Sequence, residues 1–475
     1  MSAYDPRSLD ANGFIHHGEI LATLAEARTQ AEDPGRVREI LQKAATFVGL
    51  THREAAVLLE VPSREVLAEI FTLSRKVKEH IYGRRIVMFA PLYLSDYCVN
   101  NCSYCGYSCT NKTMERRRLT QQELAEEVRV LEGLGHKRLA LEAGEDPVNC
   151  TLDYVLECIQ TIYSLKFNNG AIRRANVNIA ATTVADYARL RQAGIGTYIL
   201  FQETYHKPTY LGVHRGGPKR NYEWHTEAHD RAMQAGIEDV GVGVLYGLAD
   251  WKYDTVAMLM HGEHLEAVFG VGPHTLSVPR IRSAVGVSAS DHPNLVSDED
   301  FMKVVAVLRL AAPYAGMILS TREPVGYREE VIALGISQVS AGSCTGVGGY
   351  AGTQKLGEET VPQFEPADHR SPTEVLKDLL RDGYIPSYCT ACYREGRTGD
   401  RFMKLAKSGQ IANVCQPNAL LTLQEYMVDY GDQELQELGR GIIERELATV
   451  PNPKARAATE AFLERVQKGE RDLRF

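Results

Sequence analysis

The sequence predicts an α/β protein whose centre is a closed (β/α)8 barrel of the TIM type, with helical segments before and after it. Short apolar segments alternate with amphipathic segments eight times, and several amphipathic segments end at a glycine, as helices often do. Polar residues with catalytic chemistry follow the apolar segments, which is where active-site groups lie in such barrels. An open, doubly wound sheet is the alternative arrangement of the same alternation.

The expected strands are short and apolar, and the segments between them carry apolar residues at helical spacing. We place the strands at residues 86–94, 138–143, 176–181, 197–202, 239–245, 274–279, 316–320 and 338–341.

The chain divides into three expected parts. Residues 1–84 form a helical N-terminal extension, because apolar residues recur there at intervals of three and four and Gly83 is a plausible stop. Residues 85–350 form the barrel, and residues 351–475 form a helical C-terminal domain. The Gly- and Pro-rich segment 345–372 is interpreted as a linker that leaves the barrel.

The composition is that of a soluble globular protein, with 44% hydrophobic and 24% charged residues among 475. A net charge of −8 argues against bulk attraction to nucleic acid or to an anionic membrane. We expect a cytoplasmic protein, because no apolar run is long enough to span a membrane and the first residues lack the apolar core of a secretory signal. Ten cysteines then indicate metal or redox chemistry rather than disulfides.

Two groups of three cysteines are the strongest functional signal in the chain. Cys98, Cys102 and Cys105 follow the first expected strand in the segment CVNNCSYC. Thiolates are soft ligands that suit iron–sulfur clusters, and three of them on a four-iron cluster leave one iron without a protein ligand. A zinc site is the alternative, with Cys109 close enough to be a fourth ligand.

The second group is differently spaced. It forms a CxxC pair followed by a distant third cysteine, and its members are Cys389, Cys392 and Cys415. Because zinc knuckles and redox pairs also use CxxC, the spacing alone leaves the type of site open.

The first group resembles the signature of the radical SAM superfamily, in which CxxxCxxC carries an aromatic residue, here Tyr104, before the third cysteine. The resemblance implies that the open iron binds S-adenosyl-L-methionine. One electron then generates a 5′-deoxyadenosyl radical that abstracts a hydrogen atom from the substrate.

Further residues are expected to contact this cofactor. The segment Ala143-Gly144-Glu145 is similar to the family's GGE segment, although its first glycine is replaced by alanine. Polar residues at the ends of the third and fourth strands are also expected beside the cofactor, with strand-end caps as the alternative: Asn178, Gln202 and Glu203.

The expected substrate site lies at the end of the seventh strand, in the segment LSTREP with Ser320 and Arg322. A planar guanidinium pairs bidentately with a carboxylate, but an ion pair of Arg322 with Glu323 on the barrel rim explains the arginine equally well. The segments QETYH, PHTLSVPR and STRE resemble the tyrosine lyases of this superfamily. Those enzymes cleave the Cα–Cβ bond of L-tyrosine to p-cresol and dehydroglycine, which implies that Arg322 and Ser320 hold the tyrosine carboxylate.

The C-terminal segment with SYCTACYREGRTGDRF and CQPNALLTLQEYMVDYGD resembles the tyrosine lyases that mature iron-only hydrogenase. This implies a second, auxiliary 4Fe–4S cluster on Cys389, Cys392 and Cys415. An extra iron held by His274 and a free cysteine would there turn dehydroglycine into CO and cyanide. A channel through the barrel between the two sites is a hypothesis.

The same resemblance implies a reductant protein and other hydrogenase maturases as partners, and no nucleic acid or membrane. The alternatives are a 2-iminoacetate synthase of thiamine biosynthesis and a non-catalytic iron–sulfur scaffold or carrier.

Overall fold

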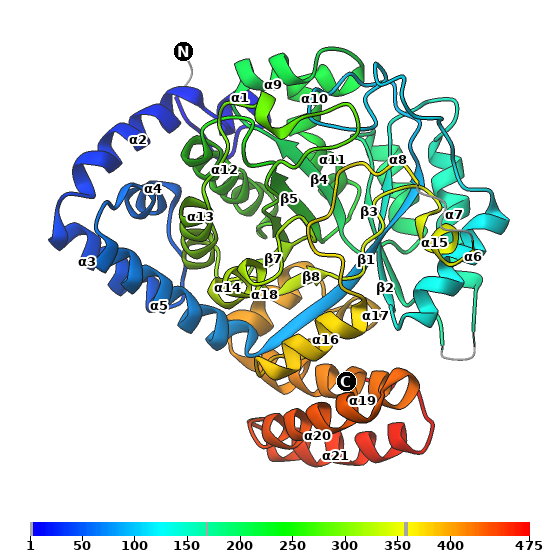
Figure 1. Ribbon diagram of the computed structural model, residues 1–475. Helices are drawn as coiled ribbons and strands as arrows, with labels where there is room; N and C mark the ends of the chain where they lie inside the picture. Colours follow the sequence, from blue (N-terminus) through cyan, green and yellow to red (C-terminus); the bar gives the residue numbers. More distant parts are fainter. Residues whose placement is uncertain (1–2, 168–169, 356–359) are drawn as a thin grey trace.

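The computed structural model describes residues 3–167, 170–355 and 360–475 and shows a closed parallel barrel surrounded by helices (Figure 1). The sheet runs in the order β2-β3-β4-β5-β6-β7-β8-β1, and β1 also pairs with β2, which closes the barrel. The predicted (β/α)8 barrel is confirmed, and the open sheet is excluded. The strands are β1 (Arg85–Ser95), β2 (Arg138–Ala143), β3 (Arg174–Asn178), β4 (Tyr198–Glu203), β5 (Val240–Val244), β6 (Thr275–Ser277), β7 (Gly316–Leu319) and β8 (Gln338–Ser340).

Helices cover the outside of the barrel, and several begin at a side-chain cap. Thr120 accepts a hydrogen bond from the backbone of Glu123 while the Glu123 side chain accepts from the backbone of Thr120, a capping box that stabilises the start of α6 by about 1 kcal/mol. The helices of the barrel region are α6 (Gln121–Gly133), α7 (Leu152–Ser164), α8 (Val184–Gln192), α9 (Lys207–Val213), α10 (Tyr222–Thr226), α11 (Ala228–Gln234), α12 (Trp251–Phe269), α13 (Asp298–Ala311), α14 (Tyr327–Leu334) and α15 (Gly349–Lys355).

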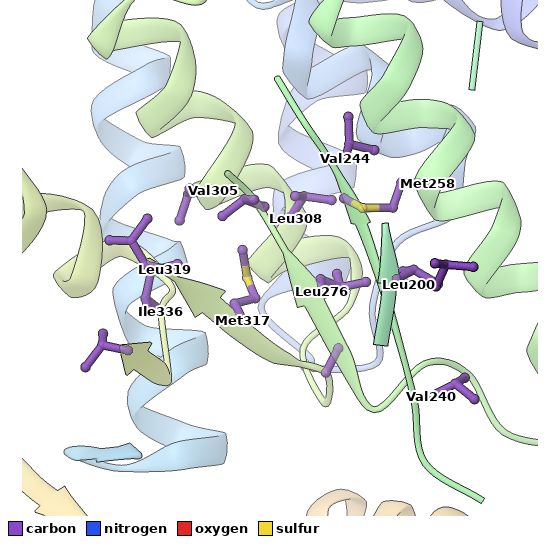
Figure 2. Close-up of a cluster of buried hydrophobic side chains, with 14 of the residues drawn as sticks. Leu200, Val240, Val244, Met258, Leu276, Val305, Leu308, Met317, Leu319 and Ile336 are labelled. Carbon is purple, nitrogen blue, oxygen red and sulfur yellow. The ribbon is translucent and has the colours of Figure 1, made fainter. Parts of the chain in front are cut away.

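The main core lies between the outer face of the strands and these helices (Figure 2). Leu276 of β6 and Met317 of β7 point outward and pack near Val305 and Leu308 of α13. All four side chains are almost completely buried. Burying one such side chain contributes about 1.5–3 kcal/mol, so this layer holds the strands in a fixed cylinder.

The N-terminal extension is helical, as predicted, and packs outside the barrel against α12 and α13 (Figure 1). Its helices are α1 (Ala11–Phe14), α2 (His17–Gln30), α3 (Pro34–Ala44), α4 (His52–Glu60) and α5 (Arg64–Tyr82).

The C-terminal region contains one strand that the sequence did not reveal. β9 (Ile385–Ser387) pairs in parallel with the first residues of β1, at Arg85–Val87, and so extends the sheet at the amino ends of the barrel strands. This pairing delivers Cys389 to that end of the barrel. The helices of this region are α16 (Pro372–Arg381), α17 (Ala391–Arg394), α18 (Gly399–Lys407), α19 (Cys415–Tyr430), α20 (Gln433–Leu447) and α21 (Pro453–Gln467). Among the described residues, no helix combines the length and apolar character needed to cross a membrane.

Candidate functional site

Two cavities occupy the interior of the barrel, and the same strands line both. On β2, Arg138 lines the cavity at the amino ends of the strands, whereas Ala140 and Glu142 line the cavity at the carboxyl ends. On β8, Gln338 likewise lines the cavity at the amino ends and Ser340 lines the cavity at the carboxyl ends. Because side chains alternate along a strand, every second residue faces the interior. We call the cavity at the carboxyl ends the first cavity and the one at the amino ends the second cavity.

The first cavity has a volume of about 220 Å³ and is lined by Cys98, Cys102 and Cys105. The three cysteines lie on the loop after β1. Arg116 holds this loop by donating hydrogen bonds to the backbone oxygens of residues 96, 107 and 108. Burial raises the pKa of the Cys105 thiol to about 11. The structure therefore brings the first predicted cysteine group together at the catalytic face of the barrel.

Gly144 lies beside this loop because only glycine fits there. A Cβ atom at position 144 would lie 2.3 Å from the backbone oxygen of Tyr97 and 3.0 Å from the Cβ atom of Cys98. A backbone hydrogen bond of 2.8 Å from Val99 N to Glu145 O joins the two segments. Ala143, Gly144 and Glu145, expected to contact the cofactor, all line the first cavity.

Glu203 and Lys219 form an ion pair of 2.7 Å in the first cavity. Glu203 ends β4 with a φ of 68°, a left-handed conformation that costs a non-glycine residue about 1–3 kcal/mol and recurs at active sites and ligand-binding positions. Burial, the largest influence, opposes the charge of Lys219, but the Glu203 carboxylate together with the sulfurs of Cys102 and Cys105 raises the pKa of the lysine. Sequence reasoning identified Glu203 but assigned no role in the site to Lys219, which lies after α9 on the short 3-10 turn of residues 218–220.

Asn178 lines the first cavity as expected, and its Nδ2 donates a hydrogen bond of 2.8 Å to Oε2 of Glu142. Burial raises the pKa of Glu142 to about 8, although the Asn178 amide and the charge of Arg322 oppose the shift. The Glu142 carboxyl is therefore mostly protonated at neutral pH. Sequence reasoning missed Glu142 because an acidic residue within a strand gives no sign of facing a cavity.

The expectation for Gln202 is corrected by the structure. The neighbours Phe201 and Glu203 line the first cavity, whereas Gln202 points to the other side of β4. Its Nε2 donates a hydrogen bond of 2.9 Å to Oγ1 of Thr226 in α10. The alternation of side chains along a strand is the reason, and a one-residue error in the expected register of β4 is enough to reverse the assignment.

Arg322 and Ser320 line the first cavity at the end of β7. The Arg322 guanidinium lies 3.5 Å from the centre of the Phe364 ring and forms no ion pair with any described residue. Glu323, the alternative partner, forms its ion pair with Arg280 instead. Burial lowers the pKa of Arg322 to about 10. A buried cation thus faces the first cavity without an ion-pair partner among the described residues.

Part of segment 345–372, which we expected to lead away from the barrel, lines the first cavity. Tyr93 donates a hydrogen bond of 3.0 Å to Oε1 of Gln363, whose Nε2 lies 3.8 Å from Sγ of Cys105. Phe364 covers Arg322. The expectation of a linker is corrected, because residues 349–355 form helix α15 and residues 363–364 line the cavity. A Gly- and Pro-rich composition does not show where such a segment runs.

The second cavity, of about 90 Å³, is lined by Cys389, Cys392, Cys415 and His274. Cys389 follows β9, Cys392 lies on α17, and Cys415 is the first residue of α19. A hydrogen bond from the Cys415 thiol lowers the pKa of Cys392, and the charge of Arg397 adds to this effect. The structure therefore joins the second cysteine group to a histidine more than a hundred residues earlier in the chain.

His274 immediately precedes β6 and is oriented by its neighbours. Its Nδ1 lies 3.5 Å from Oδ1 of Asp239, and its ring packs edge-on against Phe402 with 4.8 Å between the ring centres. Burial lowers the pKa of His274, which favours the neutral imidazole that binds metals. Because Nδ1 faces Asp239, Nε2 is the ring nitrogen available to a ligand.

The donor atoms in both cavities fit iron–sulfur chemistry, because thiolates are the ligands that such clusters use. Within the part of the chain that the structure describes, no three His, Cys, Asp or Glu side chains are grouped closely enough to hold a single metal ion.

Comparisons with known proteins agree with the arrangement of the first cavity. The family model of the radical SAM superfamily matches residues 92–261, which include all three cysteines of that cavity. The model of the Biotin and Thiamin Synthesis associated domain matches residues 277–385. The 2-iminoacetate synthase of Escherichia coli K12 is 29% identical over 353 residues, which are 74% of this chain and 90% of that protein.

Solved structures extend the similarity to the second cavity. A crystal structure of HydG, a maturase of the [FeFe]-hydrogenase, is 56% identical with a TM-score of 0.94 and covers 97% of this chain and 100% of that one. HydG from Carboxydothermus hydrogenoformans is 39% identical with a TM-score of 0.82 and covers 95% of this chain and 99% of that one. Since identity at this level spans nearly the whole chain, this protein belongs to the radical SAM superfamily and, within it, is a lyase of the HydG family.

Proposed function

We propose that the first cavity cleaves the Cα–Cβ bond of L-tyrosine to p-cresol and dehydroglycine. We further propose that the second cavity holds an auxiliary 4Fe–4S cluster with an extra iron, at which dehydroglycine becomes CO and cyanide for assembly of the [FeFe]-hydrogenase H-cluster. The similarity to HydG, which is named as a maturase of the [FeFe]-hydrogenase, supports this function.

The single observation that carries the substrate assignment is the unpaired guanidinium of Arg322. A buried cation without a counter-ion is costly, and the carboxylate of an amino acid supplies the missing charge with bidentate geometry. The Ser320 hydroxyl lies beside it on the same strand end and can donate a further hydrogen bond to that carboxylate. Phe364 packs on the guanidinium and would shield the pair from water.

Membership of the radical SAM superfamily implies a 4Fe–4S cluster and S-adenosyl-L-methionine, which together supply one-electron cleavage of strong bonds. Cys98, Cys102 and Cys105 would hold the cluster. The backbone at Ala143, Gly144 and Glu145 would hold the methionine part of the cofactor, because Gly144 brings this segment against the cysteine loop.

Asn178 and Glu203, on the first-cavity ends of β3 and β4, are proposed as further contacts to S-adenosyl-L-methionine. Glu203 would act as a pair with Lys219, so that the cavity presents both a donor and an acceptor to the cofactor.

In the second cavity, Cys389, Cys392 and Cys415 would hold the auxiliary cluster, and Nε2 of His274 would hold the extra iron. A free cysteine is proposed as a further ligand of that iron. The barrel interior is proposed to connect the two cavities, because Arg138 and Ala140 of β2 lie in different cavities although they are only about 6.6 Å apart along the strand. A labile intermediate would then pass between the sites without meeting bulk water.

A reductant protein and the other hydrogenase maturases are proposed as partners, since the family's chemistry needs an electron and a recipient for its products. We propose no nucleic-acid partner, because the net charge of −8 gives no electrostatic attraction to phosphates.

One anaerobic assay tests the proposal. The protein is reconstituted with iron and sulfide and given L-tyrosine, S-adenosyl-L-methionine and a reductant. We expect 5′-deoxyadenosine, p-cresol, CO and cyanide. The absence of both 5′-deoxyadenosine and p-cresol would exclude catalysis and favour a scaffold or carrier.

A double variant separates the two sites. Cys389→Ser with Cys392→Ser should keep p-cresol formation and lose CO, because only the second cavity is altered. Unchanged CO release would contradict the two-site assignment. p-Cresol without CO or cyanide from the unaltered protein would favour the 2-iminoacetate synthase, whose similarity covers 74% of this chain compared with 97% for HydG.

A further inference from the structure

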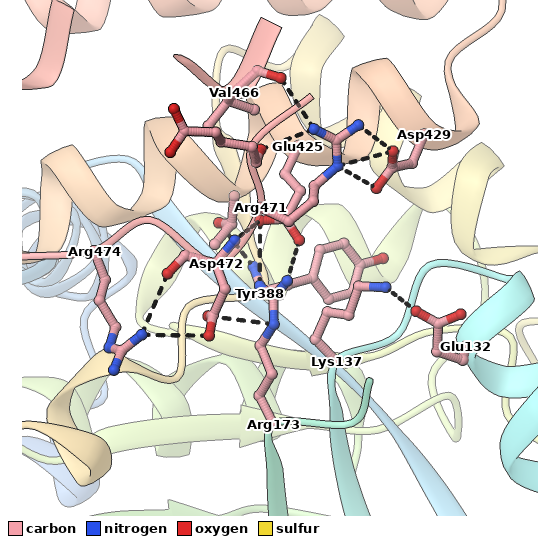
Figure 3. A network of polar contacts seen from close by, with 12 residues as sticks. Glu132, Lys137, Arg173, Tyr388, Glu425, Asp429, Val466, Arg471, Asp472 and Arg474 are labelled. Carbon is pink, nitrogen blue, oxygen red and sulfur yellow. Dashed lines mark hydrogen bonds and ion pairs between the residues drawn. The ribbon is translucent and has the colours of Figure 1, made fainter. Parts of the chain in front are cut away.

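The last residues of the chain run back across the second three-cysteine site. After α21, residues 471–475 lie against α17 and α19, the two helices that carry Cys392 and Cys415 (Figure 3). These five residues, which we call the strap, have no helix or strand of their own and are held by side-chain contacts.

Asp472 is the centre of these contacts. Arg394, at the end of α17, donates two hydrogen bonds of 2.6 Å to the two carboxylate oxygens of Asp472. Arg173, which directly precedes β3, lies 3.4 Å from the same carboxylate and also pairs with Glu425 of α19. The backbone N–H of Asp472 donates a hydrogen bond of 3.1 Å to Glu425. One residue of the strap thus joins the barrel, α17 and α19.

The backbone of Asp472 is left-handed, with a φ of 64°. Asp and Asn tolerate this conformation better than other side chains do.

The end of the strap links the two cysteine segments through Asn418 and Arg397. The backbone N–H of Phe475 donates a hydrogen bond of 2.9 Å to Oδ1 of Asn418, one turn after Cys415 on α19. The backbone oxygen of Phe475 accepts a hydrogen bond from Arg397. The N–H of Arg397 in turn donates a hydrogen bond of 2.8 Å to the backbone oxygen of Cys392.

We propose that the strap sets the relative positions of Cys392, Cys415 and the amino end of the barrel, and that Asp472 is a positioning residue for the auxiliary site. This inference rests on the proposed function of the second cavity. It goes beyond that function because it assigns a role to residues that line neither cavity. Residues that orient metal ligands from outside the ligand shell typically change metal affinity or activity by about 10- to 100-fold when they are altered.

The test replaces Asp472 with Asn, which keeps the shape and tolerates the left-handed backbone but removes the charge that holds Arg394 and Arg173. The matched control is Glu470→Gln, two residues earlier, where the carboxylate pairs with Arg465 on α21 and contacts neither cysteine segment. Both changes are made in the full chain and in a background with Cys98, Cys102 and Cys105 replaced by Ser, in which only the second cavity can hold a cluster.

In that background we expect Asp472→Asn to change the electron paramagnetic resonance spectrum of the reduced second cluster and to lower its iron content, while Glu470→Gln matches the parent. In the full chain, Asp472→Asn should lower CO yield by about tenfold with p-cresol formation kept. Arg394→Gln, which breaks the same pair from the other side, should reproduce both effects and add little to Asp472→Asn in the double variant.

Three outcomes contradict the inference. An unchanged spectrum, iron content and CO yield in both single variants would show that the strap does not position the site. Loss of p-cresol together with CO in both would show a general role in folding instead. If the protein with Cys98, Cys102 and Cys105 replaced by Ser and Asp472 unchanged held no cluster, the auxiliary cluster itself would be refuted. The proposed role of the strap would then be refuted too.

Discussion

Arg138 and Ala140 lie two residues apart on β2 and face different cavities of one barrel. The strand rises by about 6.6 Å between them, which is less than the length of a tyrosine side chain with its backbone. The layer of side chains that separates the proposed sites is therefore thin, and under the proposed passage its smallest members, such as Ala140, would set the space open to an intermediate.

Ala140→Leu should narrow the space between the two cavities. We expect p-cresol formation to persist and CO yield to fall by about tenfold, with dehydroglycine or its hydrolysis product released into solution instead, because the barrel interior would be filled by three further carbon atoms. Quantifying p-cresol, CO and the released two-carbon product in one reaction checks this. A fall in CO without any released product would contradict passage through the barrel.

Arg322→Lys should impair tyrosine binding although the charge is kept. A lysine ammonium cannot pair bidentately, and losing a charge-assisted hydrogen bond costs about 1.5–3 kcal/mol, so we expect the KM for tyrosine to rise by about 10- to 100-fold. The initial rate of p-cresol formation against tyrosine concentration gives this value. Arg282→Lys is the matched control, because Arg282 pairs with Glu323 outside the cavity lining. If both substitutions raised the KM for tyrosine equally, Arg322 would have a structural role at the barrel rim and no specific role in binding tyrosine.

Glu142 should make tyrosine binding depend on pH. Its pKa is raised to about 8, so the carboxyl is neutral below that value and becomes a carboxylate as the pH rises through it. The new negative charge would repel the substrate carboxylate and compete for Arg322, and we expect the KM for tyrosine to increase between about pH 7 and about pH 8.5. In Glu142→Gln the side chain stays neutral and the increase should disappear. Parallel pH profiles of the two proteins would exclude Glu142 as the titrating group.

Gly144→Ala should disturb the first cavity through its backbone. The added Cβ atom would lie 2.3 Å from the backbone oxygen of Tyr97, so the cysteine loop or the 143–145 segment must shift. We expect reductive cleavage of S-adenosyl-L-methionine, measured as 5′-deoxyadenosine, to fall by about tenfold or more. Gly133→Ala in α6 is the control, because nothing lies within 4 Å of its added Cβ atom. If both variants cleave the cofactor normally, the close approach at Gly144 has no part in binding it.

The sequence by itself determined the alternation of eight strands with helices and the identity of most metal-ligating candidates. Strand and helix periods are local properties of the chain, so they predict parallel strands, whereas the pairing of β1 with β2 that closes the barrel is seen only in the tertiary structure. The spacing of Cys98, Cys102 and Cys105 is local in the same sense. Strand-end chemistry and cysteine spacing also singled out Arg322 and the second cysteine group, and the resemblance to known tyrosine lyases supplied the roles expected of them and of His274.

Only the tertiary structure decided which of these residues share a cavity and what surrounds them. The position of His274 beside Cys389 depends on β9 pairing with the first residues of β1, and a strand of three residues has too little local pattern to be seen in the sequence. The outward direction of Gln202 and the return of Phe364 over Arg322 likewise depend on register and on the path of an irregular segment. The free guanidinium of Arg322 follows from the pairing of Glu323 with Arg280, a contact between residues 43 positions apart that no local pattern encodes.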